Sequence, residues 1–143
     1  MTDSKITYRG VVYPWQCDGM GHFTTRHYMA MFDAAGWHFL HEVGFDPGLV
    51  TEKNIGWADV RHEIDYLKEV REGELVVIES RPLRVGIKSI RYQLEMKSAT
   101  NDATCARLTA TCVQFDLVQR CAIPVLPEVR EQILAWLDHP EGQ

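Results

Sequence analysis

A long apolar segment at residues 28–43 constrains the fold of this chain more than any other part of the sequence. Its apolar residues recur at the three- and four-residue spacing of an α-helix: Tyr28, Met31, Phe32, Ala35, Phe39, Leu40 and Val43. Met29, Ala34 and Trp37 widen the apolar surface well beyond one stripe. Because a helix that is apolar on several sides is usually covered by other structure, we expect the rest of the chain to wrap around it.

The two ends of this helix are marked by residues that start and stop helices. Thr24 or Thr25 is a suitable N-cap, and Gly44 follows the last apolar position and is a suitable stop. A helix of about 18 residues is roughly 27 Å long, which is enough to cross a small domain. We therefore expect one central helix in a single domain that covers residues 1–143.

Beyond residue 56 the pattern changes to the two-residue alternation or the short apolar runs of β-strands. Four segments have this character: residues 60–66, 75–79, 90–96 and 106–118. An earlier strand is predicted at residues 6–13, and Pro127 is a suitable start for a short terminal helix. Strands that follow one another through short turns favour an antiparallel sheet. An antiparallel sheet that curls around the apolar helix, an α+β fold, satisfies all of these patterns.

Composition narrows the class of protein. The formal net charge of −5 argues against a nucleic-acid partner, since such domains usually carry a basic patch. No apolar run approaches the ~20 residues of a membrane span, and residues 1–9 lack the apolar core of a signal peptide. The four cysteines (Cys17, Cys105, Cys112 and Cys121) show neither a CxxC pair nor the spacing of a zinc site. We expect a cytoplasmic protein with reduced thiols and no bound metal.

The segment that leads into the helix has the character of an active-site loop. Asp18 and His22 flank the flexible Gly19-Met20-Gly21 turn. The helix that follows directs its first backbone N–H groups, and the positive end of its dipole, toward this loop. A carboxylate beside such a helix start is a candidate catalytic group, although an Asp next to a Gly is also a common turn former.

Four features of the sequence match the pattern of a known family. They are the D-x-x-G-H loop at residues 18–22, Tyr28 ten residues after Asp18, the helical segment around residues 32–35, and the later residues 66–70, 73–75 and 88–89. In these features the chain resembles the hotdog-fold acyl-CoA thioesterases of the 4-hydroxybenzoyl-CoA thioesterase type. The resemblance covers roughly residues 8–116, most of the chain.

The resemblance implies a hotdog fold, in which an antiparallel sheet wraps around the central helix. It also implies a homodimer formed by joining two sheets edge to edge, with further assembly to a homotetramer common in the family. The active sites would lie at the dimer interface, with coenzyme A along the surface. The expected partner is then an acyl-CoA substrate, and no separate cofactor is needed.

The resemblance also assigns roles to particular residues of the loop and the helix start. Asp18 matches the catalytic carboxylate, and Thr25 matches the position whose backbone N–H polarises the thioester carbonyl. Thioester hydrolysis builds negative charge on that carbonyl oxygen, which N–H groups at a helix start are suited to stabilise. A carboxylate opposite can attack the carbonyl or activate a water, and the sequence leaves both open.

Other residues are candidates for the site with less specific signals. His22 is grouped with the catalytic residues, in a role that orients the loop, and His27 and Tyr28 would face the substrate at the helix start. Trp57 and Tyr13 are candidates for the acyl pocket, although an aromatic residue near a strand end usually belongs to the core.

Three basic residues are candidates for the coenzyme A phosphates. Lys88, Arg84 and Arg91 flank a predicted break in the sheet near Gly86. Each of them, taken alone, is more often a solvated strand residue than a ligand contact.

The helix start departs from the usual family pattern, and this bears on the substrate. Many members carry Asn-Asn after the His and an Asn just before the Tyr, where this chain has Thr24-Thr25 and His27. Residues 23–28 and 67–74 are similar to the thioesterase segment found with carnitine-degrading dehydrogenases, which acts on a quaternary-ammonium acyl group. A betainyl-CoA-like substrate is one hypothesis, and four tryptophans (Trp15, Trp37, Trp57 and Trp136) are candidates for an aromatic cage around its cation.

Two other functions remain open at this point. Gly21-His22-Phe23 also suggests a hotdog-fold dehydratase or hydratase, but that family has a Pro where this chain has Thr24, and Asp18 favours the thioesterase. The third reading is a non-catalytic module that binds acyl-CoA without turnover.

Overall fold

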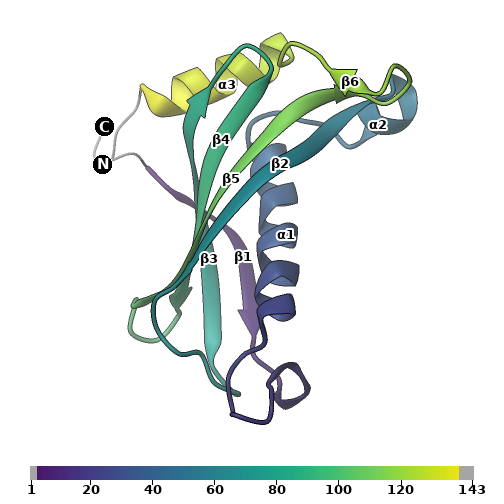
Figure 1. Ribbon diagram of the computed structural model, residues 1–143. Coiled ribbons are helices and arrows are strands. Elements are labelled where there is room, and N and C mark those ends of the chain that lie inside the picture. Colours follow the sequence, from purple (N-terminus) through teal and green to yellow (C-terminus); the bar gives the residue numbers. More distant parts are fainter. Residues whose placement is uncertain (1–2, 139–143) are drawn as a thin grey trace.

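The computed structural model describes residues 3–138 as one curved antiparallel sheet with a long helix, α1 (Thr25–Glu42), against it (Figure 1). The strands are β1 (Lys5–Val11), β2 (Ile55–Tyr66), β3 (Leu75–Val85), β4 (Ser89–Ser98), β5 (Thr104–Asp116) and β6 (Cys121–Ala122). Their order across the sheet is β1-β3-β4-β5-β2, and the short β6 pairs with β5. This is the hotdog fold that the resemblance implied.

Residues 3–138 also contain three short helices: η1 (Pro14–Gln16), α2 (Gly48–Glu52) and α3 (Pro127–Leu137). The terminal helix α3 was predicted, and its Ile133 is fully buried. The helix α2 was not predicted. Its segment contains Pro47 and Gly48, which favour turns, and a loop was therefore expected there. The first strand ends at Val11, two residues earlier than predicted, and η1 follows it closely.

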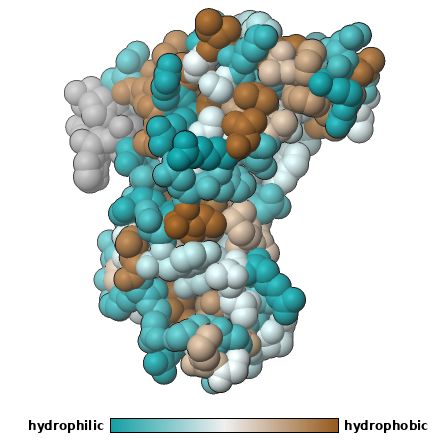
Figure 2. Space-filling view, in the orientation of Figure 1, coloured by the Kyte–Doolittle hydropathy of each residue, from teal (hydrophilic) through white to brown (hydrophobic). Residues whose placement is uncertain are grey.

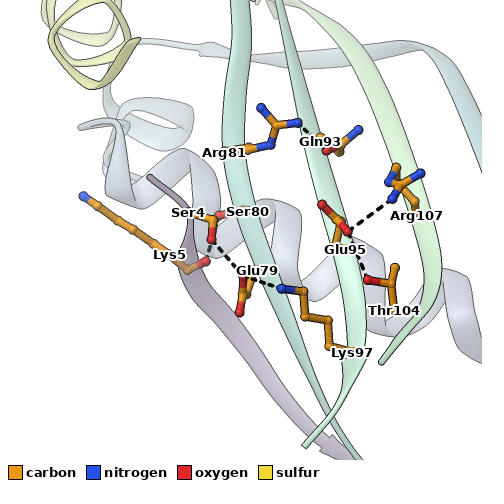
Figure 3. Close-up of polar contacts among 10 residues, drawn as sticks. All are labelled: Ser4, Lys5, Glu79, Ser80, Arg81, Gln93, Glu95, Lys97, Thr104 and Arg107. Carbon is orange, nitrogen blue, oxygen red and sulfur yellow. Dashed lines mark hydrogen bonds and ion pairs between the residues drawn. The ribbon is translucent and has the colours of Figure 1, made fainter. Parts of the chain in front are cut away.

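The two faces of the sheet differ in the way that the alternating sequence predicts. Along β4, Leu94 and Met96 are buried on the face that packs toward α1, where Phe32 and Phe39 are also buried. The intervening residues point outward and pair across strands (Figure 3), with Lys97 3.2 Å from Glu79, Arg107 3.5 Å from Glu95, and Arg81 2.9 Å from Gln93. These cross-strand pairs fix the register, because a slip by one residue would place charges in the core.

The sheet covers α1 on only part of its circumference. The helix lies against β1, β3 and β4, whereas β2 forms the far edge of the sheet. Trp37 on α1 and Val60 on β2 are therefore 51% and 58% exposed. The sheet of one chain therefore leaves part of the helix surface exposed.

The exposed apolar side chains form separate patches among hydrophilic ones on the face shown in Figure 2. The wide end of the molecule carries α2, α3 and β6, and the narrow end carries the loop before α1 (Figure 1). Within residues 3–138, no helix has both the length and the apolar character that crossing a bilayer requires.

Candidate active site

The loop before α1 is a closed turn held together by Asp18. Its Oδ1 atom accepts hydrogen bonds from the backbone N–H groups of Met20 (2.8 Å) and His22 (3.1 Å). The backbone N–H of Asp18 donates to the carbonyl of His22 at 2.9 Å, and Gly21 adopts a positive φ of 82° that a residue with a Cβ disfavours. Asp18 thus forms the turn, but within residues 3–138 no hydrogen bond occupies its Oδ2 atom.

The start of α1 leaves two backbone donors free. Thr24 is the N-cap residue, but its hydroxyl donates to the carbonyl of Gln16 (3.1 Å) and not to the helix. Counting from the start of α1, the first backbone N–H groups with an acceptor among the described residues are those of His27 and Tyr28. Both donate to the carbonyl of Thr24. The N–H groups of Thr25 and Arg26 have no acceptor among the described residues, so they are available to an anionic ligand.

Asp18 and the helix start border the same cavity, which has a volume of about 600 Å³. Its lining comes from the loop, from the first turn of α1 and from the segment after β2: Asp18, Met20, His22, Phe23, Thr24, Thr25, Tyr28, Tyr66, Leu67, Lys68, Glu69 and Val70. Pockets of 300–1,000 Å³ usually hold small-molecule ligands. Four of the predicted site residues (Asp18, His22, Thr25 and Tyr28) therefore meet at one ligand-sized cavity.

His22 is held by a carboxylate from the opposite wall of this cavity. Its Nε2 atom lies 2.6 Å from Oε1 of Glu69, and Arg71 donates to the other oxygen of Glu69 at 3.2 Å. The hydrogen bond with His22, and to a smaller extent the one from Arg71, hold the pKa of the Glu69 carboxyl below its ordinary value. Glu69 therefore stays ionised, and it holds the imidazole of His22, whose backbone N–H and carbonyl close the loop of Asp18.

Sequence reasoning did not single out Glu69 as a site residue. It follows the predicted strand at residues 60–66 and lies within the family-like segment at residues 67–74, next to Leu67 and Lys68, which also line the cavity. The available signal was an acidic residue just beyond a strand end. Only the folded chain shows that this strand end faces the loop of Asp18.

Tyr28 forms the apolar floor of the cavity. It is 5% exposed, and its ring lies 4.7 Å from that of Phe23 and 5.0 Å from that of Tyr66. Burial raises the pKa of Tyr28 to about 12. Its hydroxyl thus stays protonated at neutral pH, and the floor carries no charge.

Three of the predicted substrate residues lie outside this cavity. His27 packs its ring edge-on against Trp15 at 5.3 Å, and Trp15 stacks on Tyr13 at 6.4 Å. Trp57 lines a different cavity, between α1 and β2. The four tryptophans form no single cage, since Trp136 packs on Phe39 in the core (5.7 Å) and only Trp37 joins Trp57.

The basic residues expected to bind coenzyme A lie at the opposite end of the sheet. The hairpin between β3 and β4 carries Arg84, Lys88 and Arg91. Beside it, the carbonyl of Lys88 accepts a hydrogen bond from the backbone N–H of Gln114 on β5. The cavity of Asp18 lies beside the other end of that sheet, near Tyr66, which pairs with Ala106. Gln114 and Ala106 are eight residues apart along β5, which is a distance of about 26 Å. One chain therefore does not bring the three cations to its own Asp18.

The geometry at this cavity suits acyl transfer to water. A carbonyl placed at the helix start would have its oxygen against the free N–H groups and its carbon toward Asp18. Among the described residues, no three His, Cys, Asp or Glu side chains gather in a way that would hold a metal ion. The groups present are a carboxylate, an oriented imidazole and backbone donors.

Comparison with known proteins identifies the family. The family model of the thioesterase-like superfamily matches residues 12–137. A search of curated proteins finds no match. Among solved structures, a 1,4-dihydroxy-2-naphthoyl-CoA thioesterase from Synechocystis is 20% identical, with a TM-score of 0.79 over 94% of this chain and 98% of that one.

Two further structures contain coenzyme A. A Staphylococcus aureus protein in complex with CoA has a TM-score of 0.87 at 11% identity, over 100% of this chain and 90% of that one. A Thermus thermophilus thioesterase complexed with coenzyme A and zinc has a TM-score of 0.78 at 21% identity, over 94% and 96% of the two chains. The fold is the same in all three, and the family match spans most of the sequence. The chain therefore belongs to the thioesterase-like superfamily and is a thioester hydrolase.

Proposed function

We propose that this chain hydrolyses a small acyl-CoA thioester to the free acid and coenzyme A, at the cavity that Asp18 borders. One observation carries the proposal: Asp18, whose Oδ2 accepts no hydrogen bond within residues 3–138, and Thr25, whose backbone N–H has no acceptor there, border one cavity of about 600 Å³. Charge that develops on the thioester oxygen is stabilised by such preorganised donors, and the carboxylate supplies the attack.

Two routes use the same groups. In the first, Asp18 attacks the thioester carbon, coenzyme A leaves as a thiolate that takes up a proton, and water cleaves the resulting mixed anhydride. In the second, Asp18 removes a proton from a water as the water attacks the carbon, and the leaving thiolate receives that proton. His22, held by Glu69, keeps the loop closed around Asp18 in either route.

A panel of acyl-CoA substrates tests this function. We expect purified protein to release free thiol from at least one small acyl-CoA, measured with a thiol reagent, and to add no water to the double bond of an enoyl-CoA, measured by absorbance. Hydration without thiol release would instead indicate the dehydratase or hydratase activity. Saturable binding with neither reaction would indicate a binding module.

The acyl group in the proposal is a small one that carries a quaternary ammonium, as in betainyl-CoA. The two segments that are similar to the carnitine-linked thioesterases, residues 23–28 and 67–74, both contribute to the lining of the cavity. The carboxylate of Asp18 supplies negative charge there, whereas that of Glu69 is paired with His22 and Arg71, and Lys68 adds a positive charge to the lining. We expect kcat/KM for betainyl-CoA to exceed that for 3,3-dimethylbutyryl-CoA, its neutral isostere, by about tenfold. Equal values for the two thioesters would exclude a cation preference.

The proposal includes a homodimer, because β2 presents a long free edge. The strand spans Ile55–Tyr66 and pairs with β5 on one side only. A long edge without proline is a template for pairing with another strand. Two copies of β2 that pair antiparallel about a two-fold axis would also cover the exposed face of α1 near Trp37.

Such a dimer accounts for the position of the basic hairpin. Antiparallel pairing of the two β2 edges places the Asp18 end of one copy beside the end of the sheet that carries residues 84–91 in the other. Lys88, Arg84 and Arg91 of one copy would then bind the coenzyme A phosphates of the substrate in the other copy's cavity. Association of two such dimers gives the proposed homotetramer.

A proline in the free edge tests the dimer. Val60 has no partner on β5, since the register of the two strands shifts between Asp59 and Arg61. Val60→Pro should therefore leave the fold of the chain intact and disrupt the outer edge. We expect sedimentation velocity to show a monomer for Val60→Pro and a dimer or tetramer for wild type and for the control Val60→Thr. A Val60→Pro protein of unchanged mass would contradict pairing through β2.

A further inference from the structure

The turn between β3 and β4 is held by an arginine of helix α3. Arg130 donates from its Nη2 atom to the backbone carbonyl of Gly86, and to that of Ile87 at 3.1 Å. Figure 1 shows α3 beside this end of the sheet. The helix is anchored, because its Val129 and Ile133 are buried in the core. A half-buried guanidinium therefore ties the turn to a fixed element of the fold.

The backbone groups of this turn are unevenly paired. The carbonyl of Ile87 accepts a second hydrogen bond, from the backbone N–H of Val125 at 2.9 Å, and the carbonyl of Lys88 accepts one from Gln114 at 2.9 Å. The N–H groups of Ile87 and Lys88, in contrast, have no acceptor within residues 3–138. At residues 86–88 every carbonyl thus has a donor while two N–H groups are free, and this balance suits an anion.

The side chains around the turn carry more positive charge than their neighbours neutralise. Arg84 lies directly opposite Arg91 in the register of β3 and β4, where like charges repel. Within residues 3–138, neither Arg84 nor Lys88 forms an ion pair. Arg91 reaches Oε1 of Glu63 only at 3.8 Å, and the same oxygen lies closer to Arg61, at 3.2 Å. A phosphate group would relieve this repulsion.

We propose that Arg130 is a positioning residue for the coenzyme A phosphates. This role rests on the proposed function, in which Lys88, Arg84 and Arg91 bind those phosphates. Arg130 acts through the turn and does not itself contact the ligand. By holding the carbonyls of Gly86 and Ile87 on the side of α3, it keeps their negative ends away from the phosphates and fixes the backbone that carries Lys88.

A positioning role of this kind affects binding and not the chemical step. The nucleotide end of coenzyme A is far from the thioester carbon, so its contacts are the same in the ground state and in the transition state. Loss of such uniform binding raises KM and leaves kcat unchanged. Arg130 therefore differs in its expected effect from Asp18, whose replacement lowers kcat.

Two thioesters of the same acyl group test the proposal: acyl-CoA, and acyl-pantetheine, which lacks the nucleotide and all phosphates. For Arg130→Gln we expect KM for acyl-CoA to rise about fivefold or more, with kcat within about twofold of wild type. The kinetics with acyl-pantetheine should stay unchanged. Calorimetry with coenzyme A alone should show the same loss of affinity in the absence of turnover.

Two further variants separate positioning from charge and from folding. Arg130→Lys keeps the charge but loses the planar guanidinium, so its affinity for coenzyme A should lie between those of wild type and Arg130→Gln. Arg120→Gln removes the same charge from the turn between β5 and β6, where Arg120 donates to the carbonyl of Leu117 at 3.4 Å, and should leave the affinity unchanged. Thermal unfolding confirms that each variant is folded. If Arg130→Gln does not fold, Arg130→Lys gives the comparison with wild type.

The outcomes distinguish this role from the proposed hydrolysis. Wild-type protein that binds coenzyme A but releases thiol from no acyl-CoA would count against the hydrolysis alone, because calorimetry still measures the effect of Arg130. Unchanged affinity for coenzyme A in the folded variants of Arg130 would overturn the positioning role. Equal losses with acyl-CoA and acyl-pantetheine, or no binding of coenzyme A by wild type, would overturn it as well.

Discussion

Replacing Asp18 by asparagine should reduce thiol release from acyl-CoA by about 10²- to 10⁴-fold and leave the protein folded. Asparagine keeps an oxygen that can accept the two hydrogen bonds from the N–H groups of Met20 and His22, so the loop keeps its shape. What it lacks is the negative charge and the basicity that either route of hydrolysis needs. Initial rates with a thiol reagent, on protein whose melting temperature is measured in parallel, give the comparison.

Asp18→Ala is the matched second variant, because it removes both roles of the side chain. Without the acceptor oxygen, two backbone N–H groups of the turn lose their partner, at a cost of about 1 kcal/mol or more of unfolding free energy. We expect Asp18→Ala to match Asp18→Asn in rate but to melt at a lower temperature. Turnover close to that of wild type in Asp18→Asn would show that Asp18 only shapes the turn.

Replacing Thr25 by proline should slow hydrolysis by about 10²- to 10³-fold without weakening the helix. Thr25 is the first residue of α1, a position where proline is favoured because no helical hydrogen bond uses its N–H. The preceding Thr24 has φ −73° and ψ 148°, which a following proline allows. The substitution therefore deletes one proposed oxyanion donor and little else.

Thr25→Ala is the control for this experiment, since it removes the hydroxyl and keeps the N–H. We expect near wild-type kcat for Thr25→Ala and a loss confined mainly to kcat for Thr25→Pro, because the donor acts on the transition state. If both variants turned over at the wild-type rate, the N–H of Thr25 would not be part of the oxyanion site.

The fold was predictable because its largest signals are local. The apolar positions around Phe32 and Phe39 specify a helix, and the alternation of Leu94 and Met96 with outward charges specifies a strand with one buried face. Hydrophobic periodicity gives such elements directly. The short α2 escaped prediction because the turn signals of Pro47 and Gly48 dominate a segment of five helical residues.

The candidate site was predictable only where its residues are neighbours in the sequence. Asp18, His22 and Thr25 lie within one short segment, so one motif revealed them together. Glu69 reaches His22 across 47 positions, and this contact depends on how the end of β2 folds back over the loop. Trp57 lies opposite Gln114, at the other end of β2 from Tyr66, and it therefore borders a different cavity from Asp18.

The central claim is that one carbonyl sits between Asp18 and the start of α1. A crystal structure with a ketone analogue of acyl-CoA, in which a methylene group separates the carbonyl from the sulfur, tests it most directly. We predict that the carbonyl oxygen lies about 2.7–3.1 Å from the backbone nitrogen of Thr25 or Arg26, and that the carbonyl carbon lies about 3–3.5 Å from a carboxylate oxygen of Asp18 or from a water held by it. A carbonyl bound away from both groups, in the cavity between α1 and β2 or elsewhere on the surface, would contradict the account.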